Sequence, residues 1–361
     1  MLLVYYFLSI VSLLCFLIPF IPNQHWFFRA PEFGKVQNVL IQSILAVTGL
    51  VLNDRSVFFY TILGLLIASI VIQAVQLFRY TPLYKVNRIH KNNQSSQDIV
   101  VISANVYQFN TDYQRFIDLV YKQSADIVLT MESNMDWQQA VSVLEKDYPY
   151  THYVPLENTY GIHLYSKVEI LEIKVHYFVA DDIPSIQAKM KTPDGHVFYF
   201  FGVHPPPPSP TEEETSKERD GELLSVAKVV RNLKAPTIVV GDFNTVAWSK
   251  AATLFRKTSE TIDPRIGRGL ISTYHAKYFF LRFPIDQLYH STDIFVREIH
   301  ALPDFGSDHL PLYCRFYIDI VNEVQEKETE ELEKGEMQEV NEMISDGIEE
   351  DGDRDAIAKE S

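Results

Sequence analysis

Three long apolar stretches stand at the start of the chain. Residues 1–22 and 56–78 contain no charged side chain, and each is long enough to cross a hydrocarbon core as a helix, which takes about 20 residues. Residues 36–52 form a weaker stretch, because amide side chains interrupt one end. The first stretch lacks the flanking basic residues and the cleavage site of a signal peptide. The pattern therefore predicts a transmembrane region, residues 1–80, of about three helices.

Beyond residue 98 the pattern changes to short β-branched runs that alternate with amphipathic stretches. Such short runs are typical of strands, and apolar residues three or four apart are typical of helices. We expect strands at Asp98–Ala104, Ala125–Thr130, Tyr160–Tyr165, Glu169–Phe178, Ile186–Lys191, Val197–Val203, Thr237–Val240, Ile285–Tyr289, Asp293–Ile299 and Leu312–Ile320. We expect helices at Thr111–Gln123, Trp137–Leu144 and Glu212–Leu233. Hairpins late in the chain favour packed sheets covered by helices over a simple doubly wound sheet.

Two polar segments flank this body, which we place at residues 98–320. Residues 81–97 lose periodicity and are interpreted as a linker. Residues 321–361 are acidic and contain no aromatic side chain, and such a composition predicts disorder, at least beyond Ser345. Good helix formers would permit some helix between residues 323 and 343. A solvated tail and a partner-binding tail are the two interpretations, and the composition favours the first.

Charge is distributed unevenly along the chain. From Glu323 onward, sixteen acidic and four basic side chains give −12, so residues 1–322 carry only about −3 of the total of −15. The acidic total therefore does not exclude a phosphate-bearing substrate. The negative net charge argues against a protein that binds nucleic acid through a large excess of basic side chains. With only Cys15 and Cys314 present, a disulfide framework and a Cys-based zinc site are excluded.

Polar side chains stand where the predicted strands end. They are Asn105, Glu132, His204, Asp242 with Asn244, Asp286, and Asp308 with His309. In α/β folds, ligand chemistry is built at strand ends. Taken singly, each residue has a plainer interpretation, such as a helix cap, a turn residue or a solvated carboxylate. Their joint occurrence, each beside a hydrophobic strand, points to a single site.

From Ile99 to Phe316 the sequence resembles the endonuclease/exonuclease/phosphatase superfamily, whose fold is that of DNase I. The strongest matches are Val239–Asn244 and Gly306–Pro311, and the remaining family positions are fitted by Asn105, Met131-Glu132-Ser133 and Pro284-Ile285-Asp286. The apolar N-terminus, His204-Pro205 and Trp248-Ser249 are similar to a bacterial membrane-anchored branch, which includes proteins associated with glycopeptide resistance. The resemblance implies a four-layer α/β sandwich preceded by transmembrane helices, and divalent-metal-dependent hydrolysis of phosphate esters.

The resemblance also implies a metal site. Glu132 would bind Mg²⁺ or Mn²⁺ with Asn105 beside it, and Asp308 would add a ligand. Oxygen donors of this kind suit a hard cation, which offsets charge on the nonbridging oxygens of a phosphate. The chain departs from the family pattern at Tyr107, where some members carry an acidic residue, which puts a second metal site using that position in question.

The remaining residues would act on the water and the phosphate. The resemblance implies that Asp242 orients or deprotonates the attacking water and that Asn244 holds a phosphate oxygen. His309 would face the phosphate as an acid/base or electrostatic group, with Asp286 orienting its ring. His204 would lie near the leaving group. These roles agree with the chemistry of the side chains, since histidine exchanges protons near neutral pH and a carboxylate behind it fixes its tautomer.

Three functions stay open at this point. The first is a membrane-anchored phosphoesterase acting on a phosphorylated lipid, a lipid pyrophosphate or a phosphorylated small molecule. The second is a nuclease, although residues 92–322 contain no long Lys/Arg cluster for nucleic acid. The third is a non-catalytic binding protein, which would be free to lose Glu132, Asp242, Asn244 or His309.

Two arguments place the body on opposite sides of a cell (inner) membrane. With three spans, the 23–35 loop and the body share one side, which carries nearly all of the basic residues near the membrane. The positive-inside rule then favours the cytoplasm. Resemblance to the glycopeptide-associated branch implies the outer face, where a carrier-lipid pyrophosphate would be met. The sequence leaves both sides open.

Overall fold

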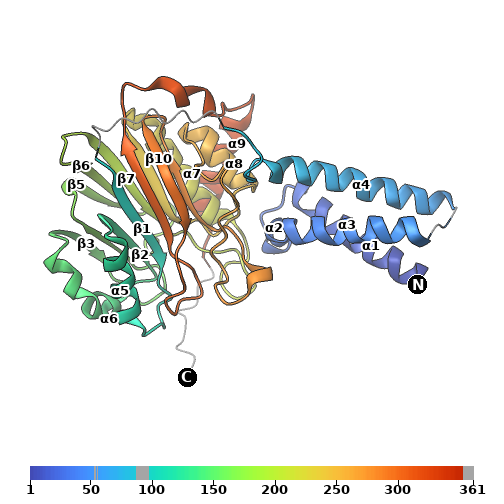
Figure 1. Ribbon diagram of the computed structural model, residues 1–361, viewed down its shortest axis with the longest axis horizontal. Coiled ribbons are helices and arrows are strands. Elements are labelled where there is room, and N and C mark those ends of the chain that lie inside the picture. Colours follow the sequence, from blue (N-terminus) through green and yellow to red (C-terminus); the bar gives the residue numbers. More distant parts are fainter. Residues whose placement is uncertain (53, 55, 87–96, 353–361) are drawn as a thin grey trace.

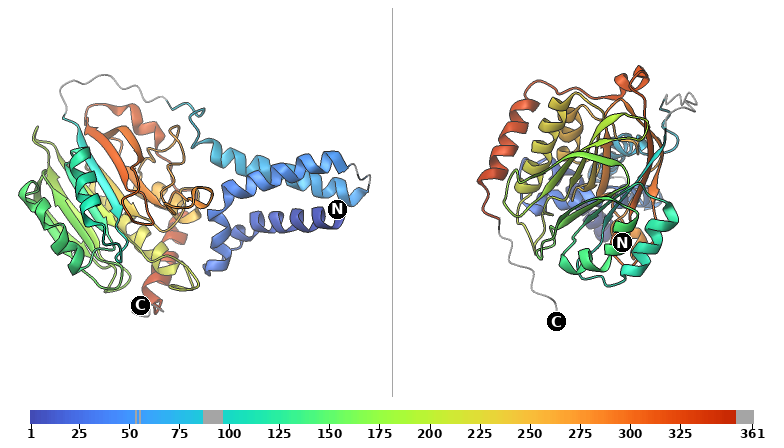
Figure 2. Two further views of the ribbon diagram at one scale, coloured as in Figure 1. Left: turned by 60° about the horizontal axis from the view of Figure 1, so that its bottom comes forward. Right: turned by 90° about the vertical axis from the view of Figure 1, so that its left-hand side faces the viewer.

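A bundle of long helices projects from a layered α/β domain (Figures 1 and 2). The computed structural model describes residues 1–52, 54, 56–86 and 97–352. The elements of the bundle are α1 (Leu2–Leu17), the 3₁₀ helix η1 (Ile18–Phe20), α2 (Trp26–Phe33), α3 (Lys35–Leu52) and α4 (Val57–Phe78). Within the described part, three helical stretches are long and apolar enough to cross a membrane: Leu2–Phe20, Lys35–Leu52 and Val57–Phe78.

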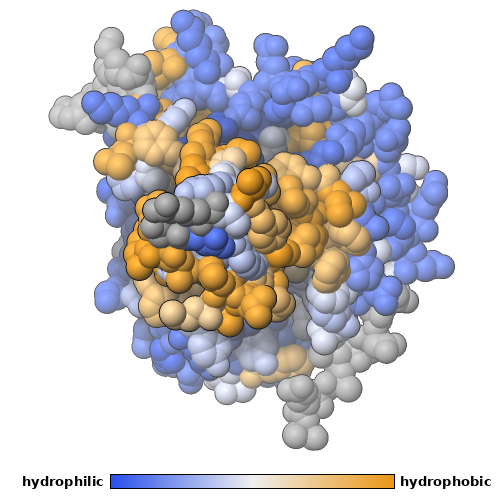
Figure 3. All heavy atoms as spheres, turned by 90° about the vertical axis from the view of Figure 1, so that its right-hand side faces the viewer, coloured by the Kyte–Doolittle hydropathy of each residue, from blue (hydrophilic) through white to orange (hydrophobic). Residues whose placement is uncertain are grey.

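Asn38 and Gln42, two polar side chains of α3, are buried in the interior of the bundle. Gln42 Oε1 accepts hydrogen bonds from Ser69 Oγ at 2.9 Å and from Gln73 Nε2 at 3.0 Å, both on α4. Gln42 Nε2 in turn donates to the carbonyl of Ser12 on α1, 3.1 Å away. Because these amides pair with neighbouring helices, the outer surface of the bundle stays apolar, as the orange side chains of Figure 3 show.

Part of the loop expected at residues 23–35 is helical. His25 caps α2, since its Nδ1 accepts a hydrogen bond from the backbone N–H of Phe27. The helix continues through Pro31 to Phe33, and Gly34 follows. An eight-residue helix with an internal proline leaves little periodic signal, and the sequence pattern therefore missed it.

Two β-sheets face each other in the α/β domain. The first has the order β10-β11-β1-β2-β4-β3, and the second has the order β5-β6-β7-β8-β9. The strands of the first are β1 (Ile99–Asn105), β2 (Ile127–Met131), β3 (Tyr150–Val154), β4 (Ile162–Ser166), β10 (Ile294–Ala301) and β11 (Leu312–Ile318). Those of the second are β5 (Glu169–His176), β6 (Ser185–Lys191), β7 (Val197–Val203), β8 (Thr237–Asp242) and β9 (Asp286–His290). A large apolar core, which includes Leu129, Phe198 and Val240, fills the space between the sheets.

Helices cover the outer face of each sheet. On the first sheet, α5 (Tyr113–Gln123), α6 (Met135–Ala140) and the 3₁₀ helix η2 (Ser142–Lys146) contribute Phe116, Trp137 and Leu144 to an outer core. On the second sheet, α7 (Lys217–Leu233) and α8 (Lys250–Ser259) contribute Leu223 and Phe255 to another. The order helix, sheet, sheet, helix confirms the four-layer α/β sandwich.

The acidic tail is structured over most of its length, and the expectation of disorder is wrong for it up to residue 352. It forms the 3₁₀ helix η4 (Glu323–Glu328) and α9 (Glu336–Glu349), which packs along α7 and α8. Val340 is fully buried against Leu224 and Leu254. Lys250 pairs with Glu339, and Lys257 with Glu336. The composition of the segment shows neither the apolar stripe of α9 nor the lysines of α8 that neutralise its acidic side chains. Residues 353–361 lie outside the described part.

The first residues of the expected linker, residues 81–97, pack on the α/β domain. Tyr84 and Val86 join a small cluster with Tyr80, Ala247 and Ile266. Residues 87–96 lie outside the described residues. Through this cluster the end of α4 packs against the loop that follows β8.

Candidate active site

The pairing of the strands brings the predicted polar residues to one edge of the sandwich. β1 and β2 are parallel, as are β7 and β8, so Asn105, Glu132, His204 and Asp242 all stand at strand ends on the same edge. The backbone N–H of Asp242 contacts Met131 Sδ at 3.1 Å, which links the two sheets. The residues surround a pocket of about 870 Å³.

Seven of the eight predicted residues line this pocket. They are Asn105, Glu132, His204, Asp242, Asn244, Asp308 and His309. The eighth, Asp286, lies behind His309, at the start of β9 and directly opposite Asp242 in the β8–β9 register. The structure thus brings together residues separated by more than 200 positions in the chain.

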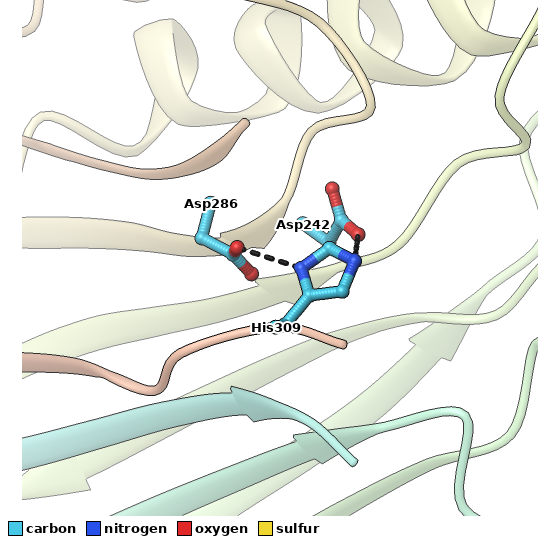
Figure 4. A group of neighbouring side chains, drawn as sticks. All are labelled: Asp242, Asp286 and His309. Atoms are coloured by element: carbon cyan, nitrogen blue, oxygen red, sulfur yellow. Dashed lines mark hydrogen bonds and ion pairs between the residues drawn. The ribbon is translucent and has the colours of Figure 1, made fainter. Parts of the chain in front are cut away.

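His309 lies between two carboxylates (Figure 4). Its Nδ1 is 2.8 Å from Asp286 Oδ2, and its Nε2 is 3.5 Å from Asp242 Oδ2. Burial lowers the pKa of His309, but the Asp286 and Asp242 carboxylates outweigh this effect and raise it to about 10. At neutral pH the imidazole is therefore a cation, held in one orientation by Asp286.

Asn105 connects Asp242 with a second carboxylate. Its Nδ2 donates to Glu132 Oε1 at 2.8 Å and to Asp242 Oδ2 at 3.2 Å. The other oxygen of Glu132 accepts a hydrogen bond from the backbone N–H of Gln108 at 3.1 Å. Burial, followed by the charge of Asp308, raises the pKa of Glu132 to about 7. In the described part of the chain, no lysine or arginine lines the pocket that contains Glu132 and Asp308.

Asn244 and His204 also lie close to Asp242. The backbone N–H of Asn244 donates to Asp242 Oδ1 at 2.9 Å, and its Nδ2 donates to the carbonyl of Pro205. His204 Nε2 lies 4.0 Å from Asp242 Oδ2. Burial lowers the pKa of His204 to about 4 against the opposing effect of Asp242. The pocket therefore holds one neutral and one protonated histidine at pH 7, an arrangement that lets one group accept a proton while the other carries charge.

Several pocket residues adopt left-handed backbone conformations. Glu132 has φ of 59°, Asn244 of 49° and Tyr107 of 55°. This region is unfavourable for side chains other than glycine, with asparagine tolerated best. Such conformations persist where the surrounding structure fixes them, and they concentrate at functional sites. Here they point to a site whose geometry is held at some cost in stability.

The comparisons with known proteins identify the family. The sequence model of the endonuclease/exonuclease/phosphatase family matches residues 102–309, more than half of the chain. The chain belongs to this family. Its members are hydrolases that act on phosphate ester bonds, as nucleases or phosphatases. No curated protein matches the chain in a sequence search.

Solved structures of the family share the fold. A family protein from Bacteroides thetaiotaomicron is 20% identical with a TM-score of 0.50, and the match covers 62% of this chain and 99% of that one. A humanized D. rerio TDP2 is 18% identical with a TM-score of 0.52, covering 61% and 98%. D. rerio TDP2 complexed with a single-stranded DNA product is 17% identical with a TM-score of 0.52, covering 61% and 99%. At these identities the likeness establishes the DNase I-like fold.

Enzymes of the endonuclease/exonuclease/phosphatase family use divalent metals, and two groups of side chains in this chain offer donors. One ligand atom each from Asp242, Asp286 and His309 lies within 4.8 Å of the others. His309 already occupies the space between those carboxylates as a cation, so a metal there would compete with it. Glu132 and Asp308 instead offer carboxylate oxygens, which are the kind of donor that Mg²⁺ and Mn²⁺ accept. Asn105 lies beside Glu132 with its Nδ2 on that carboxylate, while its Oδ1 accepts from the backbone N–H of Tyr107 at 3.0 Å.

The sequence pattern did not predict two of the residues that line the pocket. The Tyr274 ring contacts the His309 ring with centroids 4.7 Å apart, and Phe33, at the end of α2, reaches the pocket from the helical bundle. Tyr274 belongs to a loop without strand or helix periodicity. The position of Phe33 depends on how the bundle packs on the domain. A polar residue at a strand end was the available signal, and neither residue carries it.

Proposed function

We propose that this chain is a membrane-anchored, divalent-metal-dependent phosphoesterase whose substrate is a phosphorylated lipid, a lipid-linked pyrophosphate or a phosphorylated small molecule. α1, α3 and α4 would cross a cell membrane, and the catalytic domain would act beside it. The observation that carries the proposal is Phe33: a residue adjoining the predicted membrane spans forms part of the wall of the pocket that holds Asp242 and His309.

The walls of the pocket support a substrate with an apolar portion. Aromatic, proline and aliphatic side chains surround the acidic centre: Phe33, Tyr107, Phe109, Pro207, Pro208, Tyr274 and Ile285. Among the described residues, no lysine or arginine lines the pocket. A nucleic-acid groove carries such side chains, because neutralising successive phosphates supplies much of the affinity. The pocket is better matched to one phosphate group attached to an apolar body.

Each residue of the site has a part in this hydrolysis. Glu132, Asn105 and Asp308 would hold Mg²⁺ or Mn²⁺, which supplies charge neutralisation at the phosphate oxygens. Asp242, fixed by hydrogen bonds from Asn105 and Asn244, orients the attacking water and accepts its proton.

The remaining residues act on the phosphate group itself. His309, protonated and oriented by Asp286, stabilises the negative charge that builds up on the phosphate. The side-chain amide of Asn244 holds a phosphate oxygen, and His204 lies near the leaving group. In-line displacement at phosphorus needs positioning and electrostatic stabilisation above all, and these residues provide both.

The test is a product assay with the full-length protein reconstituted in nanodiscs. A polyprenyl pyrophosphate, phosphoinositides, a soluble chromogenic phosphoester and plasmid DNA are offered with Mg²⁺, and each is repeated with EDTA. We expect metal-dependent release of phosphate or of a phosphorylated headgroup from at least one lipid or small-molecule substrate. Glu132→Gln serves as the variant with weakened metal binding, and Glu169→Gln, on exposed β5, as its matched control. Cleavage of DNA with no turnover of the other substrates would replace the proposal with a nuclease.

A further inference from the structure

The loop between Tyr274 and β9 presents a run of large apolar side chains to solvent. Tyr278, Phe279, Phe280 and Leu281 are 60%, 73%, 81% and 56% exposed. Three of them form the 3₁₀ helix η3 (Phe279–Leu281), and Tyr278 directly precedes it. Four consecutive exposed side chains of this size are unusual on a soluble domain, where apolar surface is normally scattered, and such patches mark interaction sites.

This patch lies beside the helical bundle. Gln37 Nε2, in the first turn of α3, donates a hydrogen bond to the carbonyl of Phe280 at 2.7 Å. Nearby, the rings of Phe33 and Phe283 meet edge to face with centroids 5.8 Å apart. Figure 1 shows the orange η3 segment on the side of the catalytic domain that faces the bundle. The patch is therefore continuous with the apolar surface of the bundle, part of which faces the viewer in Figure 3.

Polar groups on the bundle mark the level of the patch. α3 begins at Lys35 and α4 ends at Phe78, and Lys35 Nζ donates to Gln76 Oε1 at 2.7 Å. These polar groups stand where two of the apolar spans meet the catalytic domain, which is the depth of lipid headgroups if the spans cross a bilayer. Gln37, which donates to the carbonyl of Phe280, lies only two residues after Lys35 in α3. Phe280 therefore stands at the same boundary.

The flanks of the patch are basic. Lys277 precedes the apolar run and Arg282 follows it, with the Arg282 guanidinium 5.8 Å from the centre of the Phe279 ring. Apolar side chains between lysine and arginine are typical of segments that lie in the membrane interface, where the rings enter the acyl boundary and the cations reach the headgroup phosphates.

We propose that residues 277–282 form an interfacial anchor that inserts into the lipid leaflet nearest the catalytic domain and holds the mouth of the pocket at the bilayer surface. The loop is coupled to the site at its start, because Tyr274 contacts the His309 ring and the backbone N–H of Ala276 donates to the carbonyl of Asp308. This arrangement presents the pocket to substrates that remain in the leaflet. The anchor rests on the proposed membrane insertion of α1, α3 and α4.

Fluorescence quenching tests the anchor without requiring turnover. Full-length Phe280→Trp is reconstituted in liposomes of phosphatidylcholine brominated on its acyl chains, and its emission is compared with that of wild type to subtract Trp26, Trp137 and Trp248. Tyr121→Trp is the matched control, because Tyr121 is 41% exposed on α5, on the far side of the domain from the bundle (Figure 1). We expect brominated lipid to quench the emission added at position 280 and not that added at position 121.

Equal emission in brominated and plain lipid at position 280, in protein that resists carbonate extraction, would overturn the anchor while leaving membrane insertion of the helices intact. A change in the emission at position 280 that appeared only after a protein partner was added would assign the patch to that partner. This result would also overturn the proposal. Failure of the chain to reconstitute would overturn both the anchor and the membrane part of the proposed function.

A second measurement connects the anchor with the proposed function. The double variant Phe279→Ser/Phe280→Ser should lose about tenfold or more of its turnover on a lipid-embedded substrate, and should keep wild-type turnover of a soluble chromogenic phosphoester. Equal loss on both substrates would show a general defect of the site and would contradict a role in presenting lipid substrate.

Discussion

Asp286→Asn separates the orientation of His309 from its charge. The substitution keeps an oxygen that can accept from His309 Nδ1, which lies 2.8 Å from Asp286 Oδ2, and removes the negative charge. Two unit charges about 4 Å apart at an effective dielectric constant of about 20 interact by about 4 kcal/mol, which corresponds to roughly three pKa units. The pKa of His309, about 10 in the wild type, should therefore fall to about 7.

The sign of the resulting pH dependence follows from the charge of the histidine. The imidazolium is present below its pKa and is lost as the pH rises through it, so the wild type should keep its active form from pH 6 to pH 8. With a pKa of about 7, the protonated fraction falls about tenfold between pH 6 and pH 8. The ratio of Asp286→Asn to wild-type turnover should fall by the same factor, whereas His309→Ala should lose about 10²–10⁴-fold at both pH values.

The assay is the initial rate of phosphate release at saturating Mg²⁺ between pH 6 and pH 8, with Asp118→Asn as the control for an exposed carboxylate on α5. An Asp286→Asn profile parallel to that of wild type would contradict this prediction, because it would mean that Asp286 does not set the protonation of His309. A loss as large as that of His309→Ala at pH 6 would also refute it, since orientation alone would then account for the effect.

Three further predictions concern the metal, the interior and the membrane. Glu132→Gln should raise the Mg²⁺ concentration for half-maximal turnover by about tenfold or more, with partial rescue by Mn²⁺; an unchanged Mg²⁺ titration would remove Glu132 from the metal site. Burial raises the pKa of Glu222 to about 8, so its contribution to stability is present below about pH 4.5 and is lost as the pH rises towards 8. Glu222→Gln keeps the acceptor for Ser185 Oγ and has no charge to bury. Its free energy of unfolding relative to that of wild type should therefore be higher at pH 8 than at pH 5, by up to about 4 kcal/mol. Thermal unfolding in detergent would measure this difference, and identical pH dependence in the two proteins would contradict it. The full-length chain should stay with the membrane fraction through carbonate and high salt because of its three apolar helices, and release by either treatment would rule out integral insertion.

The sequence was informative about the site because strand ends carry a readable signal. A short apolar run followed by a polar residue locates both the strand and its end, and the parallel pairs β1–β2 and β7–β8 bring those ends to one edge. The roles assigned to these residues stay predictions. Tyr274 and Phe33 had no such signal, since their places depend on a loop without periodicity and on the packing of the bundle against the domain.

The tail shows the opposite case, in which composition misled. Averaged over the segment, acidic residues outweigh apolar ones, but Val340 and its apolar neighbours recur at helical spacing along α9. Their partners, Leu224 on α7 and Leu254 on α8, lie on helices far away in sequence. Repulsion among the acids is offset by Lys250 and Lys257 on α8. Such tertiary neutralisation cannot be read from the charge of one segment.

We propose that the pocket around His309 hydrolyses a phosphate ester in a metal-dependent reaction. The most direct test measures Mg²⁺-dependent phosphate release by full-length wild type and His309→Ala in nanodiscs, on the best substrate of the panel. His300→Ala is the control, because the His300 side chain is 42% exposed. We expect activity in wild type and His300→Ala, abolished by EDTA, and a loss of about 10²–10⁴-fold in His309→Ala, measured on protein that still shows a cooperative thermal unfolding transition. Full metal-dependent activity in His309→Ala would contradict it.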